Sequence, residues 1–532
     1  MLQLCSSTLP LLGITAFGPA AAASAIGNLL SGSLHSSSSF AQQQRQQQQQ
    51  RHLSRDALAG QPTHYTHPNV LGPDELAPGL HISEFQARRR NLARLMPPGS
   101  IAIIPAASLA YVTGVIPYPY RQDADFLYLT GVQQQSVAII QTDGSAGYRF
   151  QLYVPSPDTE KERWDGAWVG QQAAQQVFKA DEVYSILELP ARIQQLAASA
   201  NAVLFDFDRH NSYQFQSLRQ SLHEAIGKGK TMPLRPHMHR LRWVKSPGEL
   251  ALMRSSATIA AQSMHRCMAV SHADVHEQLL ATEFEYGVKL AGASRLAYPV
   301  VAGGGADSCT IHYSRNDKQV GDGQVLLMDA GCEYHGYVSD VTRTWPVNGR
   351  YTAEQRQVYE TVLEVRRRCL EAAVPGNTLG KVHQLSVQLL SEGLRDLGLL
   401  PRATLEDFQK GLYREFYCHS VGHYLGMDVH DTNTVGPHRT LEPGVVMAIE
   451  PGLYIPDHPQ FGAYAGIGVR IEDDVLVTHS GAEVLSDAVP VDPDQIEALV
   501  GAAAGEARLS ASTASSHSSS DEPPVVFRAA VA

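Results

Sequence analysis

The chain has 532 residues, more than a single hydrophobic core usually contains, so two domains with terminal extensions are expected. Lys and Arg number 42 against 53 Asp and Glu, and the net charge of −11 argues against non-specific binding to nucleic acid. The six cysteines are scattered without a CxxC pattern, which is typical of a reducing compartment, and no apolar run is long enough to predict a membrane span.

Residues 1–59 are expected to lie outside both domains. Residues 1–55 contain no Asp or Glu, and they include four serines at 36–39 and a glutamine-rich stretch at 42–50. Such an acid-poor, Ser- and Arg-containing N-terminus is typical of an organelle transit peptide, although composition also allows a low-complexity tail without an address. A secretory signal is a third interpretation, but no Lys or Arg precedes the apolar stretch 11–26.

Residues 60–243 predict the smaller of two domains. Strand-like apolar runs alternate in it with helix-like segments, the strands at 100–105, 136–140 and 150–154 and the helices at 171–178 and 190–200. This alternation favours an α/β layer structure.

A second domain is expected over 244–498. Ser246 and Glu249 form a capping box with Pro247 at the first helical position, so a long helix should begin there. Further helices are expected at 358–370 and 382–397, and strands at 325–329, 337–344, 445–450 and 469–477. Residues 331–336 should form a hairpin turn, which would point Asp329 and Asp340 from adjacent strands into one pocket. The Ala-, Ser- and Pro-rich end, 499–532, is expected to be a disordered tail.

Four carboxylates and one imidazole stand in apolar or glycine-rich stretches of this second domain: Asp329, Asp340, His423, Glu450 and Glu472. A carboxylate in an apolar strand must be paired or must bind a metal, and few Lys or Arg are nearby in sequence. Four carboxylates carry −4 and a ligating imidazole is neutral, so two divalent ions balance the charge better than one. Oxygen-rich ligation suits Mn²⁺, and Co²⁺, Fe²⁺ or Zn²⁺ are compatible. Two such ions form a hydrolytic centre, which makes hydroxide at neutral pH and polarises a carbonyl.

The motifs around these residues resemble a known family, the pita-bread metallopeptidases, and most closely the aminopeptidase P (Xaa-Pro aminopeptidase) branch and its mitochondrial members. They occur in the family's order, at 311–313, 327–331, 339–344, 419–423, 428–431, 450–454 and 468–474. Upstream, 118–131 resembles the N-terminal domain of the same branch, and 60–68 resembles the start of the mature mitochondrial form. The resemblance implies an N-terminal α/β domain followed by an α+β pita-bread catalytic domain.

The resemblance also implies how the metals are held. Asp329 would bind one metal, Asp340 and Glu472 would bridge both, and His423 and Glu450 would complete the second. Glu450 would in addition carry a proton towards the leaving nitrogen. Taken alone, the two aspartates could equally be ordinary turn residues.

Five further residues are implied at the site. His312 and His430 would bind substrate near the scissile carbonyl and stabilise the oxyanion, and His419 would line the same cleft as a third catalytic histidine. Tyr454 would form the cleft wall, and Arg470 would support a bridging ligand and the substrate. Each has an ordinary alternative: a histidine satisfied in the core or at the surface, a core tyrosine, and an arginine paired with the aspartates at 473–474.

The implied function is a dinuclear metal-dependent aminopeptidase that releases the N-terminal residue of a peptide, preferentially where Pro follows. Its partners would be peptide or protein N-termini and a second copy in a homodimer. Resemblance to the mitochondrial members implies that 1–59 is a transit peptide and that the enzyme processes imported proteins, with a plastid as the alternative destination. A prolidase-like dipeptidase would share every ligand. A non-catalytic pita-bread binding module would usually lack the ligands that this chain retains.

Overall fold

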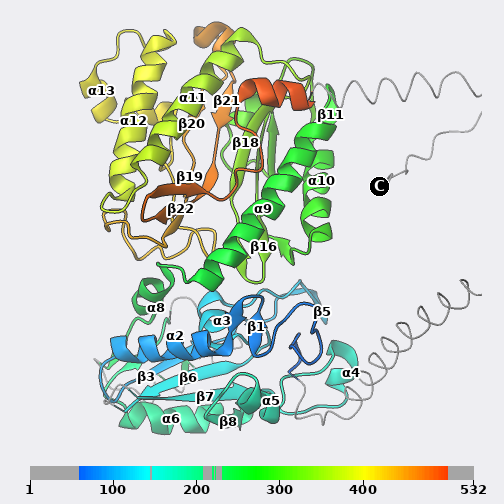
Figure 1. Cartoon of the computed structure of the whole chain (residues 1–532), viewed down its shortest axis with the longest axis vertical. Helices are drawn as coiled ribbons and strands as arrows, with labels where there is room; N and C mark the ends of the chain where they lie inside the picture. Colours follow the sequence, from blue (N-terminus) through cyan, green and yellow to red (C-terminus); the bar gives the residue numbers. More distant parts are fainter. Residues whose placement is uncertain (1–58, 144–146, 208–218, 221, 223–229, 501–532) are drawn as a thin grey trace, which may run out of the picture.

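The computed structural model describes residues 59–143, 147–207, 219–220, 222 and 230–500. The expected transit peptide and C-terminal tail therefore lie outside the described residues, apart from Ala59, Leu499 and Val500. The chain forms a smaller N-terminal lobe and a larger C-terminal lobe that sit one above the other (Figure 1). Within the described ranges, no helix is long and apolar enough to cross a membrane.

The N-terminal lobe is built on a mixed six-stranded sheet. Its strands are, in spatial order, β10 (Thr231–Met232), β9 (Val203–Leu204), β3 (Ile101–Pro105), β6 (Val137–Thr142), β7 (Tyr148–Val154) and β8 (Glu182–Ser185). Side chains of β3 alternate between two cores, because Ala102 and Ile104 pack on one face and Ile101 and Ile103 on the other. Helices α2 (Ile82–Leu95) and α3 (Ala124–Thr130) cover the face towards the C-terminal lobe, and α6 (Leu189–Ser199) covers the other (Figure 1).

The C-terminal lobe contains short antiparallel sheets between two pairs of helices. The strands that carry the site are β13 (Val301–Gly304), β15 (Val325–Ala330), β18 (Val341–Pro346), β19 (Val446–Ile449), β20 (Gly452–Tyr454), β21 (Gly468–Arg470) and β22 (Asp473–Thr478). The helices are α9 (Pro247–Val270) and α10 (Glu277–Leu290) on one side and α11 (Ala353–Ala372) and α12 (Leu379–Asp396) on the other (Figure 1). The capping box that begins α9 is confirmed, since Ser246 and Glu249 each bond the other's backbone.

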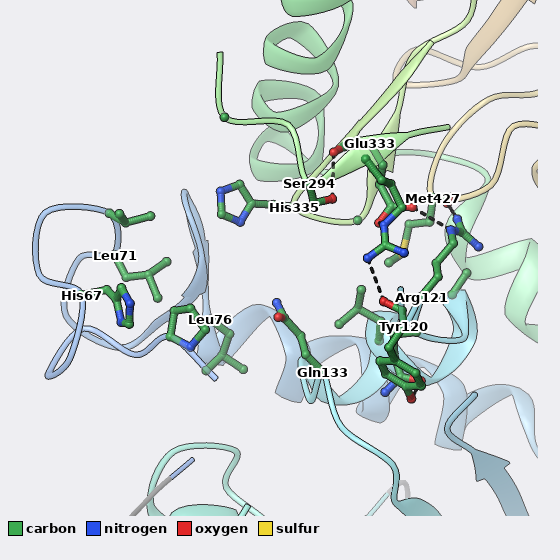
Figure 2. Close-up of a pocket in the computed structure, with 18 residues that line it drawn as sticks. His67, Leu71, Leu76, Tyr120, Arg121, Gln133, Ser294, Glu333, His335 and Met427 are labelled. Atoms are coloured by element: carbon green, nitrogen blue, oxygen red, sulfur yellow. Dashed lines mark hydrogen bonds and ion pairs between the residues drawn. The ribbon is translucent and has the colours of Figure 1, made fainter. Parts of the chain in front are cut away.

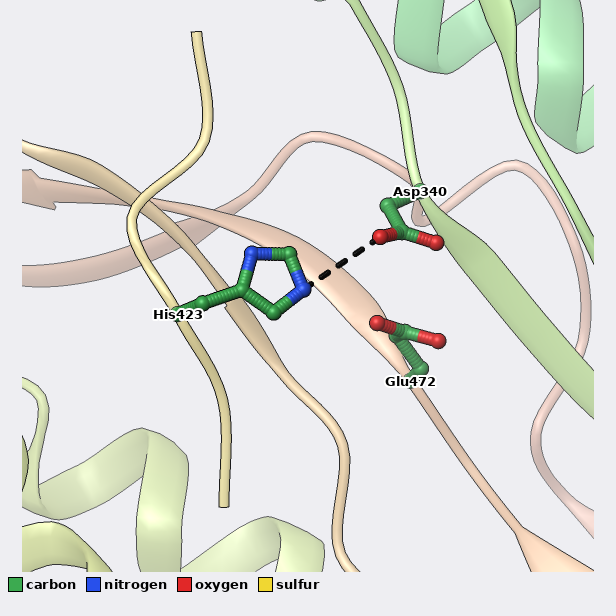
Figure 3. A group of neighbouring side chains, drawn as sticks. All are labelled: Asp340, His423 and Glu472. Carbon is green, nitrogen blue, oxygen red and sulfur yellow. Dashed lines mark ion pairs between the residues drawn. The ribbon is translucent and has the colours of Figure 1, made fainter. Parts of the chain in front are cut away.

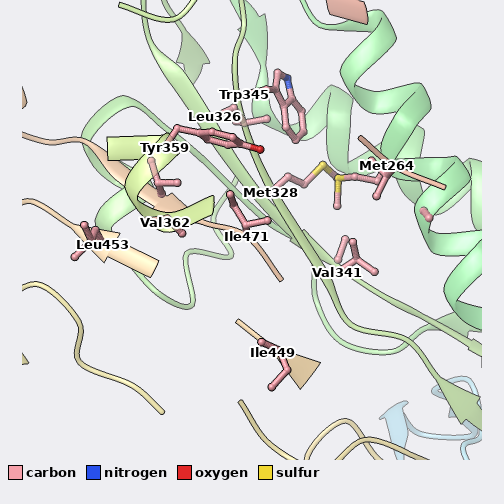
Figure 4. Packing of buried hydrophobic residues seen from close by; sticks show 14 of the residues in the cluster. Met264, Leu326, Met328, Val341, Trp345, Tyr359, Val362, Ile449, Leu453 and Ile471 are labelled. Atoms are coloured by element: carbon pink, nitrogen blue, oxygen red, sulfur yellow. The ribbon is translucent and has the colours of Figure 1, made fainter. Parts of the chain in front are cut away.

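One continuous core joins the strands to these helices. Met264 of α9, Leu326 of β15, Trp345 of β18 and Tyr359 of α11 are all fully buried in it (Figure 4). The strands are therefore held from both sides, which fixes the positions of the polar side chains they carry.

The hairpin expected around 331–336 differs in detail. Residues Cys332–Tyr334 form strand β16, which pairs with β17 (Tyr337–Val338), so the turn itself is only His335 and Gly336. Both turn residues have positive φ, 48° and 84°, which is the backbone of a two-residue hairpin turn. The sequence lacks the Asn-Gly or Asp-Gly pair that usually marks such a turn, so the extra strand was not predicted.

Candidate metal centre

Strand alternation turns Asp329 away from the main core. Leu326 and Met328 of β15 pack in that core, whereas Leu327 belongs to a small apolar cluster on the opposite face. Asp329 is two residues beyond Leu327 and therefore shares its face.

Asp340 reaches the same place from the two-residue break between β17 and β18, where an unbroken strand over 337–344 was expected. Asp329 pairs with Thr342 of β18, and Asp340 lies two residues before Thr342, on the same side. The hydroxyl oxygen of Tyr298 is 2.6 Å from Oδ1 of Asp329 and also contacts Oδ1 of Asp340, so the two carboxylates share its single proton. The backbone N–H of Asp340 donates to Asp474 Oδ1 at 3.0 Å. The two aspartates therefore meet at the same tyrosine hydroxyl.

His423 and Glu450 are brought together by a segment that runs along β19. The N–H of Glu450 donates to Val421 O at 2.7 Å, and the N–H of Ala448 donates to His423 O at 2.9 Å. A Cβ on Gly422 would lie 1.9 Å from Ala448 O, so only glycine allows this close approach.

Glu472 completes the group from between β21 and β22. It pairs with Thr342 in an isolated bridge, and the Thr342 hydroxyl donates to Glu472 Oε2 at 2.5 Å. Ligand atoms of Asp340, His423 and Glu472 all lie within 4.8 Å of one another, and Figure 3 shows the three side chains converging. His423 Nε2 is 3.4 Å from Asp340 Oδ2 and 3.8 Å from Glu450 Oε1.

Arg470 binds Asp329 directly rather than pairing with neighbouring aspartates at the surface. Its Nη2 donates to Asp329 Oδ2 at 2.6 Å, and its Nη1 donates to the Tyr454 hydroxyl at 3.0 Å. The Tyr454 hydroxyl and His419 Nε2 are 2.8 Å apart, and His419 Nδ1 is 2.7 Å from Ser420 O. These distances fit one direction of donation, from Arg470 to Tyr454 to His419, with the remaining imidazole N–H donating to Ser420 O.

Burial disfavours the ionised form of three of these carboxylates and so raises their pKa values. Burial raises the pKa of Glu450 to about 7, although His423 and Arg470 oppose the shift. Burial, followed by repulsion from Asp340, raises the pKa of Glu472 well above its usual range, and burial also raises that of Asp329. Burial would lower the pKa of His423, but the hydrogen bond and charge of Asp340 outweigh it and raise the pKa to about 9. The group therefore attracts positive charge.

The donor set fits divalent metal ions. With the four carboxylates ionised and His423 neutral, as metal ligation requires, the carboxylates carry −4 and Arg470 supplies +1, which leaves −3 to be neutralised by cations. Nδ1 of His423 is 3.3 Å from Tyr424 O, the geometry in which Nδ1–H donates and Nε2 offers a lone pair to a metal. We call Asp329, Asp340, His423, Glu450 and Glu472 the metal-ligand cluster.

His430 lies at the edge of this cluster. The rings of His430 and His423 meet edge-to-face, with centroids 4.4 Å apart, and His430 is otherwise exposed. Burial, then Arg470 and more weakly His312, lower the pKa of His419 to about 3, so His419 is neutral. His312 is exposed and lies within electrostatic range of His419. The pKa of His430 is also lowered, chiefly by burial and by His423, and to a smaller extent by His312.

Several supporting residues were not predicted from the sequence. They are Tyr298 and Asp474, which bond the aspartates, Thr342, which bonds Glu472, and His383 of α12, whose Nδ1 accepts the N–H of Val421 at 3.2 Å. Thr342 and Asp474 fall inside the motifs at 339–344 and 468–474, but neither of them was assigned a role at the site from the sequence. Tyr298 and His383 stand in unremarkable sequence, and only the fold brings them to the site.

Comparison with known proteins bears on this arrangement. Residues 251–479 match metallopeptidase family M24, and residues 85–205 match the aminopeptidase P N-terminal domain. The mitochondrial intermediate cleaving peptidase 55 of Arabidopsis thaliana is 40% identical, over 83% of this chain and 87% of its own length. The chain belongs to metallopeptidase family M24. Human Xaa-Pro aminopeptidase 3 is 37% identical to this M24 peptidase, over 83% of this chain and 90% of the human one.

The structure of the M24 peptidase also resembles a solved one. Zinc-substituted Escherichia coli aminopeptidase P, in complex with product, superposes with a TM-score of 0.75 at 34% identity, covering 79% of this chain and 98% of that chain. The expected fold of an aminopeptidase P N-terminal domain followed by a pita-bread domain is confirmed, as is the expected family. This M24 peptidase is an enzyme of the Xaa-Pro aminopeptidase type.

Proposed function

We propose that the chain is a dinuclear aminopeptidase that removes the N-terminal residue of peptides, preferentially where Pro follows. The observation that supports this best is the convergence of four buried or partly buried carboxylates and His423 from five separate segments. Asp329, Asp340, His423, Glu450 and Glu472 would hold the two ions. Mn²⁺ is the metal we expect for so oxygen-rich a set, with Co²⁺, Fe²⁺ and Zn²⁺ as compatible ions. Bound there, such ions would polarise the scissile carbonyl and lower the pKa of water.

The chain's own groups supply proton transfer and charge stabilisation. Glu450 Oε1 lies 3.8 Å from His423 Nε2 within the cluster, and the Glu450 carboxylate would carry a proton to the leaving Pro nitrogen. His430 lies beside the cluster with an exposed imidazole, and His312, also exposed, lies within electrostatic range of His430. An N–H of either would donate to the oxygen of the scissile carbonyl.

A hydrogen-bonded row fixes the remaining side of the site. Arg470 binds Asp329 and Tyr454, and Tyr454 binds His419. Asp329 is thereby oriented from the side opposite Tyr298, and His419 stays neutral and able to contact a peptide.

Substrate length separates this proposal from its nearest alternative. Matched Xaa-Pro dipeptide, tripeptide and decapeptide substrates are expected each to lose one N-terminal residue, and analogues with Ala in place of Pro should react more slowly. Mass spectrometry of the products is the measurement. Cleavage of the dipeptide alone would make the chain a prolidase, and no cleavage by metal-loaded protein would favour a binding module.

The cellular proposal concerns the N-terminus. We infer mitochondrial import, with a plastid as the alternative, because the first 55 residues lack acids and the Arabidopsis relative is mitochondrial by name. Loss of about 50 to 60 residues is expected on import, where the acid-free segment ends. N-terminal sequencing of the endogenous protein tests this, and an intact Met1 on most molecules would contradict it. The role would be the trimming of imported proteins.

Two structural expectations accompany the function. We propose domain limits at 60–243 and 244–498, of which the capping box at Ser246 supports the boundary between the domains. The last helical residues run two positions beyond 498, to Val500, which is buried in the core of the second domain. We also propose a homodimer, for which analytical ultracentrifugation of the purified enzyme is the direct measurement.

A further inference from the structure

The segment that carries His430 is held by charged residues from outside the metal-ligand cluster. We define the His430 loop as Gly426–Thr432. Its N-terminal end is tied to β17 by the bond from Val338 N–H to Gly426 O at 2.9 Å. Its two aspartates, Asp428 and Asp431, lie on either side of His430 in sequence, and both are bound by arginine.

Arg121 approaches the His430 loop from the N-terminal domain. It lies just before α3, 307 residues from Asp428 in sequence. Its Nη2 donates to Met427 O at 2.7 Å, both terminal nitrogens are 3.2 Å from Asp428 Oδ1, and its Nε donates to Glu333 Oε2 at 2.6 Å. Figure 2 shows the Arg121 side chain reaching between Glu333 and Met427 at the boundary of the two lobes.

Arg242 binds the same loop from the helix that connects the domains. Its side chain is only 1% exposed, and it lies at the end of α8 (Arg235–Arg242). Nη1 donates to Asp125 Oδ1 of α3 at 2.6 Å, and Nη2 donates to Asp428 Oδ2 at 2.9 Å and to Asp431 Oδ1. Both oxygens of Asp428 are therefore held, one by Arg121 and the other by Arg242.

The second oxygen of Asp431 is also satisfied. Lys245 Nζ is 3.3 Å from Asp431 Oδ2, and both side chains are 1% exposed. A Cβ on Gly426 would lie 2.4 Å from that same oxygen, so the loop closes tightly around the carboxylate. Displacing the loop would leave the buried charges of Arg242 and Lys245 without partners, which is strongly unfavourable.

The sequence motif before α3 gains a role from these contacts. Arg121 and Asp125 both belong to the 118–131 segment, which no step of the proposed reaction uses. Bidentate and charge-assisted bonds fix direction as well as distance, so they suit a positioning task.

We propose that Arg121 and Arg242 are positioning residues for His430. Through Asp428 and Asp431 they set the place of its imidazole beside His423, so the N-terminal domain forms part of the catalytic arrangement. This rests on the proposed function of His430 as a donor to the substrate carbonyl.

Arg121 is the residue to change, because it is 39% exposed and its loss should leave the fold intact, whereas Arg242 is buried. Arg121→Gln is expected to lower kcat for a Xaa-Pro tripeptide about tenfold with little change in KM, the size of effect typical of a displaced partner in direct contact. Metal content and melting temperature should match the parent enzyme. Arg121→Lys should restore part of the rate, because an ammonium still reaches one carboxylate.

A double-mutant cycle with His430→Ala separates positioning from general support of the fold. If Arg121 acts through His430, Arg121→Gln should change kcat less than about twofold once the imidazole is gone. Arg254→Gln is the matched control, since Arg254 is 44% exposed and forms a two-pronged pair with Glu483 elsewhere. Asp428→Asn, which removes the charge that both arginines contact, should reproduce the loss independently.

The outcomes distinguish the two levels of the proposal. If His430→Ala is impaired while Arg121→Gln and Asp428→Asn keep the parent kcat, the positioning role alone is overturned. Fully additive losses in the double-mutant cycle would have the same meaning. If His430→Ala keeps the parent kcat, the proposed role of His430 as a donor to the substrate carbonyl is overturned, and the positioning role of the two arginines is overturned with it.

Discussion

Asp340→Asn is expected to abolish aminopeptidase activity in a chain that still folds. Asparagine keeps the shape of the side chain but replaces an anionic oxygen that lies 3.4 Å from His423 and within the Asp340–His423–Glu472 group. We expect two metal ions per parent chain and fewer in the variant, since a neutral amide neither bridges nor balances them. Activity should fall by at least about 10³-fold, because metal ions supply several kcal/mol and every ~1.4 kcal/mol is tenfold in rate.

Elemental analysis, circular dichroism and a Xaa-Pro peptide assay on one preparation check this result. Asp322→Asn is the matched control, because Asp322 is an exposed carboxylate in the turn before β15. Near-normal turnover in a folded, metal-loaded Asp340→Asn enzyme would show that Asp340 is structural. Full parent activity with a single ion per chain would contradict the two-metal proposal.

The metal-ligand cluster could be predicted because its carboxylates stand in or beside apolar strands, where an unpaired charge is unfavourable. Asp329 is the last residue but one of an apolar strand and Glu450 follows another, so each carboxylate had to have a partner wherever the strand was placed. The capping box at Ser246 was equally local, and it fixed the start of the helix that leads into the catalytic domain.

The contacts that support the cluster are of a different kind. Tyr298 bonds both aspartates, yet nothing in its neighbouring sequence marks it. Arg470 was expected at the site because it stands beside Glu472, but its bond to Asp329, 141 residues away, was not expected. The bonds from Arg121 to the His430 loop span even more of the chain. Such pairs are set by topology, and a single sequence shows local pattern but not which distant segments meet.

Arg343→Met is expected to destabilise the catalytic domain by about 3–5 kcal/mol, the cost of leaving a buried charge without its partner. Arg343 is completely buried, and its guanidinium donates to the carbonyls of Thr342, Glu472, Val489 and Pro490 as well as to Asp473 Oδ1 at 2.8 Å. Methionine fills much of the space but leaves these acceptors unsatisfied. Because Glu472 is one of the residues held, metal affinity should fall together with stability.

Urea unfolding of metal-free protein, followed by circular dichroism, measures this effect without the contribution of bound ions. Arg254→Met removes an exposed pair and should cost less than about 1 kcal/mol. Arg366 also binds Asp473, at 2.5 Å, and it should keep that carboxylate partly compensated, so the variant is expected to fold at low temperature. A loss as small as that of the control would mean that water or a shift of residues 489–490 satisfies the acceptors. The buried arginine would then position Glu472 without adding to the stability of the fold.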